Sequence, residues 1–193
     1  MTRPIGLIDS GLGGFSIYYG LKQHFPDAPL IMLADQKNAP YGPKSFQQLH
    51  EITVINIDLL IKMGCNHILF ACNTISALLL DSMQRLFPDI EIVGVIDATV
   101  ATVDPVDSLA VIATKANIES HAYQSKLKDK FPSIKIKEII AHDLATMIED
   151  LVDEQHIGSY IDMLLEGIDV DVMILGCTHY PLVRHLFEKQ KSM

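Results

Sequence analysis

One pattern occurs twice in this chain: a short apolar run that ends directly in a cysteine, which polar side chains follow. The first copy is ILFACNT at residues 68–74, and the second is VMILGCTH at residues 172–179. A short apolar run bounded by polar residues predicts a buried strand, and open parallel sheets bind ligands just beyond the carboxyl ends of their strands. We therefore expect the thiols of Cys72 and Cys177 to face each other across one small substrate.

Strand-like and helix-like segments alternate in both halves of the sequence, which predicts an α/β fold. Strands are expected at residues 5–8, 29–34, 68–71, 90–96, 109–113, 134–140 and 170–175. Helices are expected at residues 15–24, 46–63 and 75–87 in the first half. In the second half, one helix is expected to run through Tyr123 to about residue 130, and residues 142–165 are expected to be helical with a break near 155–158.

The spacing of the polar residues that follow these strands indicates an internal duplication. Cys72 and Cys177 lie 105 residues apart, and so do Asp9 and Thr114, each of which follows the first strand of its half. Two similar α/β units that pack with these strand ends facing each other would place both thiols at one shared cleft.

Length and composition fit one or two compact domains. A chain of 193 residues with 49% hydrophobic side chains can bury a sizeable core. Residues 103–108 read as a linker, so we predict a first α/β domain at 1–103 and a second at 104–193. The predicted fold is therefore two pseudo-symmetric domains, each a mostly parallel sheet flanked by helices, with the active site in the cleft between them.

The charge and hydropathy patterns exclude several classes of partner. The formal net charge is -9, which argues against nucleic acid, because phosphates require a positive field. No apolar run reaches the roughly 18 to 20 residues that span a bilayer, so we expect no membrane association. The first residues also lack the apolar core of a signal peptide, and we expect a cytoplasmic protein.

The cysteines do not read as a disulfide framework or a zinc site. There are three of them, widely spaced, with no second pair of metal ligands nearby. Cys65 is expected to be a packing residue, since free cysteines are usually buried. The glycine-rich turn at residues 9–14 lacks the spacing of a phosphate-binding loop. We therefore expect neither a metal nor a nucleotide cofactor.

Two opposed thiols suit proton transfer at a carbon that is reached from both faces. One thiolate would remove the Cα proton while the opposite thiol protonates the other face, which is racemisation. Cys72 is also expected near a helix N-terminus, whose positive end would lower its pKa. We expect Asp9 to assist one thiol and His179 the other. Candidates for carboxylate binding are Asn73, Thr74 and Thr178.

Four motifs occur together: DSG with a following GG at residues 9–14, PYG at 40–42, ACNT at 71–74 and GCTHYP at 176–181. This set resembles the glutamate racemase family of the aspartate/glutamate racemase superfamily. The resemblance implies a cofactor-independent enzyme that interconverts L- and D-glutamate and supplies D-glutamate for peptidoglycan synthesis. A homodimer is one expected state, because dimers are common in the family. The implied catalytic residues are Cys72, Cys177, Asp9 and His179, and the implied substrate-binding residues are Ser10, Tyr41, Gly42, Asn73, Thr74, Thr114 and Thr178.

The chain also departs from the family pattern. Asn117 stands where a threonine is usual, and the carboxylate that would assist the second cysteine is either Glu149 or Asp150. Family members continue for some tens of residues beyond the last motif, whereas this sequence stops at Met193. On that comparison the first domain would lack part of its core and one wall of its cleft.

Three functions remain open on the sequence alone. The first is a glutamate racemase, and the second is an aspartate or broad-specificity amino-acid racemase, because specificity depends on the shape of the pocket. The third is a catalytically impaired protein that keeps the racemase fold and binds a ligand. Activity on both enantiomers of glutamate and aspartate, with each cysteine replaced in turn, distinguishes the three.

Overall fold

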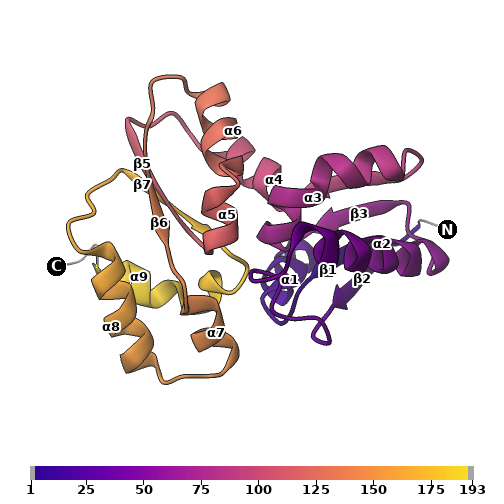
Figure 1. The fold of residues 1–193 in the computed structure, drawn as a ribbon, viewed down its shortest axis with the longest axis horizontal. Helices are drawn as coiled ribbons and strands as arrows, with labels where there is room; N and C mark the ends of the chain where they lie inside the picture. The colour runs from indigo at the N-terminus through magenta and orange to yellow at the C-terminus, as the bar shows by residue number, and fades with distance from the viewer. Residues whose placement is uncertain (1–2, 191–193) are drawn as a thin grey trace.

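The computed structural model describes residues 3–190, and the structural statements below concern that range. The chain forms two α/β halves that lie side by side (Figure 1). The first half contains β1 (Ile5–Asp9), α1 (Gly14–His24), β2 (Leu30–Ala34), α2 (Phe46–Lys62), β3 (His67–Phe70), α3 (Asn73–Leu86), β4 (Glu91–Gly94) and α4 (Val95–Thr102). The second half contains β5 (Ser108–Ala113), α5 (Lys115–Glu119), α6 (Ala122–Lys130), β6 (Lys135–Ile140), α7 (Leu144–Glu149), α8 (Glu154–Leu165), β7 (Val172–Gly176), the 3-10 helix η1 (Tyr180–Val183) and α9 (Arg184–Gln190).

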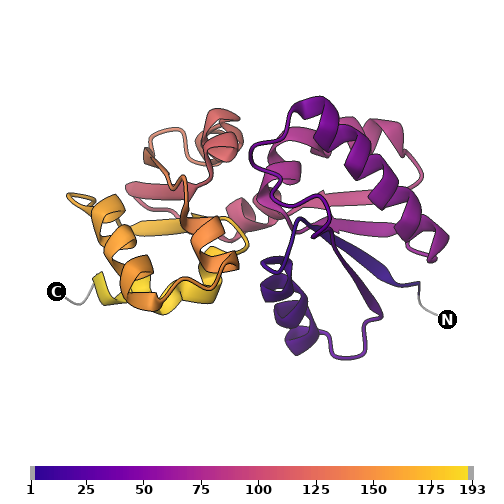
Figure 2. The same ribbon diagram turned by 60° about the horizontal axis from the view of Figure 1, so that its bottom comes forward.

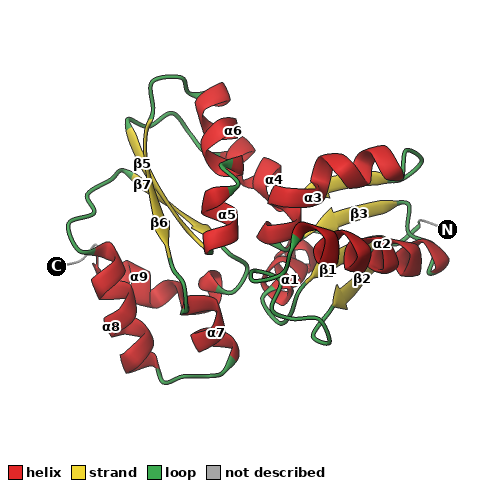
Figure 3. Cartoon of the chain, in the orientation of Figure 1, coloured by secondary structure: helices red, strands yellow, loops and turns green. Residues whose placement is uncertain are grey.

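Each half is built on its own parallel sheet (Figure 3). The strand order is β2-β1-β3-β4 in the first sheet and β6-β5-β7 in the second. In both sheets the strand that comes first in the chain is central, and the next two strands lie on either side of it. The shared order confirms the predicted fold of two pseudo-symmetric α/β units with parallel sheets.

The apolar runs become strands because helices cover the sheets. Figure 2 shows α1 on the opposite side of the first sheet from α2. Parallel strands that are covered on both faces consist of continuous apolar residues. The central strand β5 follows this rule, since every residue from Leu109 to Ala113 is fully buried. The central strand β1, by contrast, ends in a buried carboxylate, that of Asp9.

Helix α4 was not predicted, and neither were the 3-10 helix η1 and helix α9. The strand expected at residues 90–96 ends at Gly94, and the next eight residues form α4. Its sequence, VIDATVAT, is rich in β-branched side chains, which favour strands. Packing against α3 and α6 outweighs this preference, and Ile96 and Val100, which are four residues apart on one helical face, are buried.

Two predicted helices are interrupted at positions that the sequence analysis did not identify. The helix expected through Tyr123 divides into α5 and α6, because His121 adopts a left-handed conformation with φ of 54°. The second break lies between α7 and α8 rather than near residues 155–158. Leu151 has φ of 55° there, and the Asp153 carboxylate accepts hydrogen bonds from the first backbone N–H groups of α8.

Residues 103–107 connect α4 with β5, and the predicted boundary at residues 103–104 falls within this connection. The ammonium group of Lys130, at the end of α6, donates hydrogen bonds of 2.8 Å to the carbonyl oxygens of Val100, Ala101 and Val103. These bonds satisfy the last carbonyls of α4 and attach α4 to the second half. Within residues 3–190, no helix combines the length and the apolar composition needed to cross a membrane.

Candidate active site

A cavity of about 340 Å³ lies between the two halves, at the carboxyl ends of the central strands and their neighbours. Two groups of predicted site residues line it. The first half contributes Ser10, Tyr41, Gly42, Cys72, Asn73 and Thr74, and the second half contributes Thr114, Cys177, Thr178 and His179. Asp9 is the one predicted site residue that does not line the cavity, and its side chain is fully buried.

The two thiols occupy equivalent positions in the two sheets. Cys72 follows β3 and is the N-cap residue of α3, and Cys177 directly follows β7. Both side chains are buried, and both line the cavity. The duplicated sequence pattern therefore corresponds to a duplicated structural position, with one thiol from each half.

The thiol of Cys72 lies in a largely desolvated environment. It donates a hydrogen bond to the hydroxyl of Ser10, with an Sγ–Oγ distance of 3.9 Å. Burial and the charge of Asp9 raise the pKa of Cys72 to about 11, although the backbone N–H groups of Ile75 and Thr74 lower it. The start of α3 thus lowers the pKa of Cys72 as expected, but desolvation has the larger effect and the net shift is upward.

The thiol of Cys177 is in contact with a pair of ionisable side chains. Its Sγ atom lies 3.6 Å from Nδ1 of His179, and Nε2 of the same imidazole contacts the Glu149 carboxylate. Burial raises the pKa of Cys177 well above its usual value; the backbone N–H of His179 opposes this shift, and the charges of Cys72 and Asp9 add to it. Of the two carboxylates that the sequence left open, the structure places Glu149 against His179.

Asp9 connects the two halves beneath the cavity. Its carboxylate accepts a hydrogen bond of 3.0 Å from the backbone N–H of Gly11 and one of 3.1 Å from the hydroxyl of Thr178. Burial raises the pKa of Asp9, although these two bonds and the charge of His179 oppose the shift. Asp9 is therefore positioned to set the electrostatic potential at both thiols, since it influences the pKa of each.

The Tyr41 phenol does not point into the cavity as a free group. It donates a hydrogen bond of 2.8 Å to Asp35, and the side-chain amide of Asn56 donates to both of these residues. Burial opposes ionisation of Asp35, yet hydrogen bonds from Asn38, Tyr41 and Asn56 keep its pKa below the usual value. The phenol therefore holds the loop in place, and Tyr41 and Gly42 line the cavity from this loop.

Two buried oxygens on the second half's wall of the cavity have no hydrogen-bond partner among the described residues: Thr114 Oγ1 and Asn117 Oδ1. Thr114 is the N-cap residue of α5, but its side chain does not cap the helix. The NH₂ group of Asn117 donates a hydrogen bond of 3.2 Å to the carbonyl oxygen of Gly176, whereas the side-chain oxygen of Asn117 has no such partner among the described residues. Unpaired buried polar atoms are costly, so this wall is suited to a ligand with hydrogen-bonding groups.

The sequence analysis did not identify Tyr123 as a residue near the site. Its hydroxyl donates a hydrogen bond of 2.7 Å to Asn73 Oδ1 across the boundary between the halves. No local pattern marks this tyrosine, because the two partners are 50 residues apart in the chain and lie on helices of different halves, α3 and α6.

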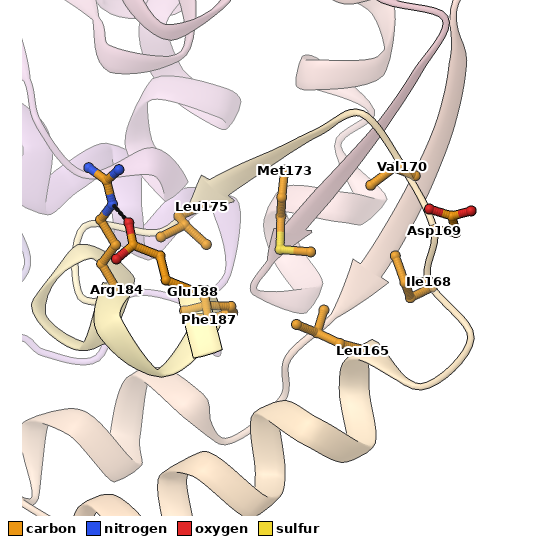
Figure 4. Close-up of a pocket in the computed structure, with 9 residues that line it drawn as sticks. All are labelled: Leu165, Ile168, Asp169, Val170, Met173, Leu175, Arg184, Phe187 and Glu188. Atoms are coloured by element: carbon orange, nitrogen blue, oxygen red, sulfur yellow. Dashed lines mark hydrogen bonds and ion pairs between the residues drawn. The ribbon is translucent and has the colours of Figure 1, made fainter. Parts of the chain in front are cut away.

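A larger cavity, of about 600 Å³, lies away from the thiols. Figure 4 shows its lining residues, which are Leu165, Ile168, Asp169, Val170, Met173, Leu175, Arg184, Phe187 and Glu188. The side chains of Arg184 and Glu188 form an ion pair of 2.7 Å at its edge. None of these nine residues was predicted as a site residue, and most of them are apolar, so size alone does not identify the functional cavity.

Comparisons with known proteins extend over both halves. Residues 16–191 match the family model described as Asp/Glu/Hydantoin racemase. A glutamate racemase from Lactobacillus helveticus is 36% identical over 192 residues, covering 96% of this chain and 72% of that protein. One from Lactobacillus johnsonii is 34% identical, covering 95% of this chain and 71% of that protein. The crystal structure of glutamate racemase from Francisella tularensis in complex with D-glutamate matches with a TM-score of 0.89 at 34% identity, covering 97% of this chain and 73% of that chain.

Proposed function

This chain belongs to the Asp/Glu/Hydantoin racemase family, and on that basis we propose that it is a glutamate racemase in which two thiols exchange a proton at Cα without a cofactor. One observation carries the proposal: two buried thiols, from equivalent strand ends of two sheets, line one small cavity. The names of the relatives and the D-glutamate bound in the Francisella tularensis structure support glutamate as the substrate.

The proposed reaction begins with a thiolate on one side of Cα. That thiolate takes the Cα proton, and the electron pair left on carbon is delocalised into the α-carboxylate. The opposite thiol then gives its proton to the other face of the same carbon. Each turnover exchanges the protonation states of Cys72 and Cys177, so the reverse reaction uses the same groups in opposite roles.

Burial raises the pKa of both thiols and so favours their protonated forms. The ammonium group of a bound amino acid adds a positive charge beside them, which favours a thiolate. At Cys177, we expect His179 to accept the thiol proton and Glu149 to stabilise the resulting imidazolium, a role that the contacts among the three side chains support. At Cys72, the hydroxyl of Ser10 and the backbone N–H groups at the start of α3 stabilise the thiolate.

The polar walls of the cavity would hold the two carboxylates of the substrate. Asn73 and Thr74 begin the 14-residue helix α3, and a helix N-terminus favours an anion. The backbone at Tyr41 and Gly42, together with Ser10, offers further donors on the same half. Thr114 and Thr178 contribute hydroxyls from the other half. A small substrate with two carboxylates and one ammonium fits this arrangement.

We also propose, from the family resemblance, that the D-glutamate formed serves peptidoglycan synthesis and that the protein forms a homodimer. Depletion of the protein in growing cells, with rescue by external D-glutamate, tests the first proposal. Analytical ultracentrifugation tests the second, and a monomer at micromolar concentration would contradict it.

The first test of the catalytic proposal is deuterium incorporation at Cα of glutamate in D₂O, followed by NMR. Wild-type protein should exchange the Cα proton and racemise both enantiomers, and Cys72→Ser and Cys177→Ser should each abolish racemisation. L- and D-aspartate are measured in parallel, and faster exchange with aspartate would assign the aspartate specificity instead. If folded protein incorporates no deuterium into either amino acid, the chain has the racemase fold without racemase chemistry, and the proposal is refuted.

A further inference from the structure

Tyr123 contacts both catalytic halves from a position outside the predicted site. It lies on α6 with only 3% of its surface exposed. Its hydroxyl donates a hydrogen bond of 2.7 Å to the side chain of Asn73, which directly follows Cys72. Its ring also lies close to Gly176, which directly precedes Cys177: a Cβ atom built on Gly176 would be 3.2 Å from Cε2 of the tyrosine. One side chain therefore lies against the residues next to both thiols.

The hydrogen bond determines which end of the Asn73 amide is free. The phenol occupies the oxygen of the amide, Oδ1, so the NH₂ group is the end left for the cavity that Asn73 lines. The orientation matters because the amide ends are chemically opposite: the NH₂ group donates to a carboxylate, whereas the oxygen repels it. A flip of this amide would exchange an attractive contact for a repulsive one.

The environment of Tyr123 keeps the phenol in the donating form. Burial raises its pKa well above the usual value, the Thr99 hydroxyl opposes the shift, and the charge of Cys177 adds to it. A protonated phenol that faces an amide oxygen at 2.7 Å is a good donor. The bond is also buried and thus protected from competing water.

We propose that Tyr123 is a positioning residue for substrate binding: its hydroxyl holds the Asn73 amide with the NH₂ group directed at a carboxylate of the amino-acid substrate. The proposal rests on the racemase function proposed above. Tyr123 itself does not touch the substrate in this scheme, since it acts through Asn73. It also links the second half of the chain to a binding group of the first, so substrate affinity depends on how the two halves are joined.

The test is Tyr123→Phe, which removes the hydroxyl and keeps the ring against Gly176. We expect KM for both enantiomers of glutamate to rise about tenfold, the size of one lost hydrogen bond to a charged group, while kcat changes less than about threefold. The matched control is Tyr160→Phe, because that hydroxyl accepts a long, exposed bond of 3.4 Å from the backbone of Asp143. The control should leave both kinetic constants unchanged.

A double-mutant cycle separates positioning from general loss of packing. In an Asn73→Ala background, Tyr123→Phe should have no further effect on KM, because the group that it positions is absent. Additive effects of the two substitutions would overturn the proposal, as would an unchanged KM in Tyr123→Phe when wild type is active.

A second readout does not require activity. The side-chain NH₂ signals of Asn73 in a ¹⁵N–¹H spectrum should shift in Tyr123→Phe and stay in place in Tyr160→Phe. Unshifted signals would overturn the proposed orientation even in an inactive protein. An inactive wild type whose signals do shift would count against the racemase function alone, so the two failures are distinguishable.

Discussion

The contact between Glu149 and His179 allows one catalytic prediction to be developed quantitatively. The change is Glu149→Gln, which keeps the size of the side chain and removes its negative charge. The imidazole that it contacts is 9% exposed, and the glutamate side chain is 29% exposed. Hydrogen bonds to charged groups contribute about 1.5 to 3 kcal/mol, and partial exposure of Glu149 favours the lower end of that range. Since about 1.4 kcal/mol changes a rate tenfold, we expect kcat/KM to fall roughly 10- to 30-fold.

The symmetry of the reaction dictates how the loss appears. L- and D-glutamate have equal free energies, so every variant must have the same kcat/KM in both directions. Impaired proton transfer at Cys177 therefore cannot change the ratio of the two kcat/KM values. It changes the rates at which the two enantiomers exchange their Cα proton with solvent. In D₂O, the enantiomer whose proton Cys72 removes should take up deuterium without inversion, whereas the other should exchange slowly. Circular dichroism measures the racemisation, and NMR measures the exchange in the same samples.

The adjacent carboxylate provides the matched control. Asp150→Asn removes the same charge one residue further along the chain, and it should change kcat/KM by less than about twofold. A decrease in Asp150→Asn as large as that in Glu149→Gln would show that general electrostatics, and not the contact with His179, is responsible. Glu149→Gln with kcat/KM close to wild type would refute the reasoning altogether.

Three further predictions concern stability. In Gly14→Ala the new Cβ would lie 2.4 Å from the Cβ of Asp9, so urea denaturation should show a free energy of unfolding about 1 to 3 kcal/mol lower than that of wild type. In the matched variant Gly20→Ala, nothing lies within 4 Å of the new Cβ, and the free energy of unfolding should rise by about 0.5 to 1 kcal/mol. The pKa of Cys72 is about 11 in the folded state and roughly 8.5 in the unfolded state, so the unfolded state loses its proton first as pH rises. Relative to Cys72→Ser, wild type should therefore lose about 2 kcal/mol of its free energy of unfolding between pH 7.5 and 10, and equal slopes would contradict the assigned burial. Leu60→Ala removes a fully buried side chain and should cost about 2 to 5 kcal/mol, visible as a lower Tm; a loss below about 1 kcal/mol would contradict the packing described.

The sequence predicted the strands and the thiol positions well, because both depend on local patterns. A buried parallel strand is a continuous apolar run, and the residue that ends such a run lies at the edge where ligands bind. Cys72, Cys177 and the residues next to them could therefore be placed at a common cleft without coordinates. The duplication at a spacing of 105 residues added the expectation that the two sheets would be arranged alike.

The features that the sequence analysis missed depend on contacts between distant segments. Val95–Thr102 has the composition of a strand and becomes helix α4 through its packing on α3 and α6. The choice between Glu149 and Asp150 depends on which face of α7 meets His179, and no spacing rule supplies that information. Tyr123 reaches Asn73 from the other half of the molecule. Each of these outcomes is determined by tertiary structure and not by local propensity.

The arrangement of the two sheets has a consequence for the order in which the protein folds. Each sheet is built from one continuous stretch of chain, β1 to β4 and then β5 to β7, so neither half must wait for the other to form its strands. The bond between Asp9 and Thr178, in contrast, joins residues 169 positions apart. During synthesis the first half can form its sheet while the second is still being made. We therefore expect the cleft to be completed late, because Cys177, Thr178 and His179, which close its second side, are the last of its lining residues to be translated.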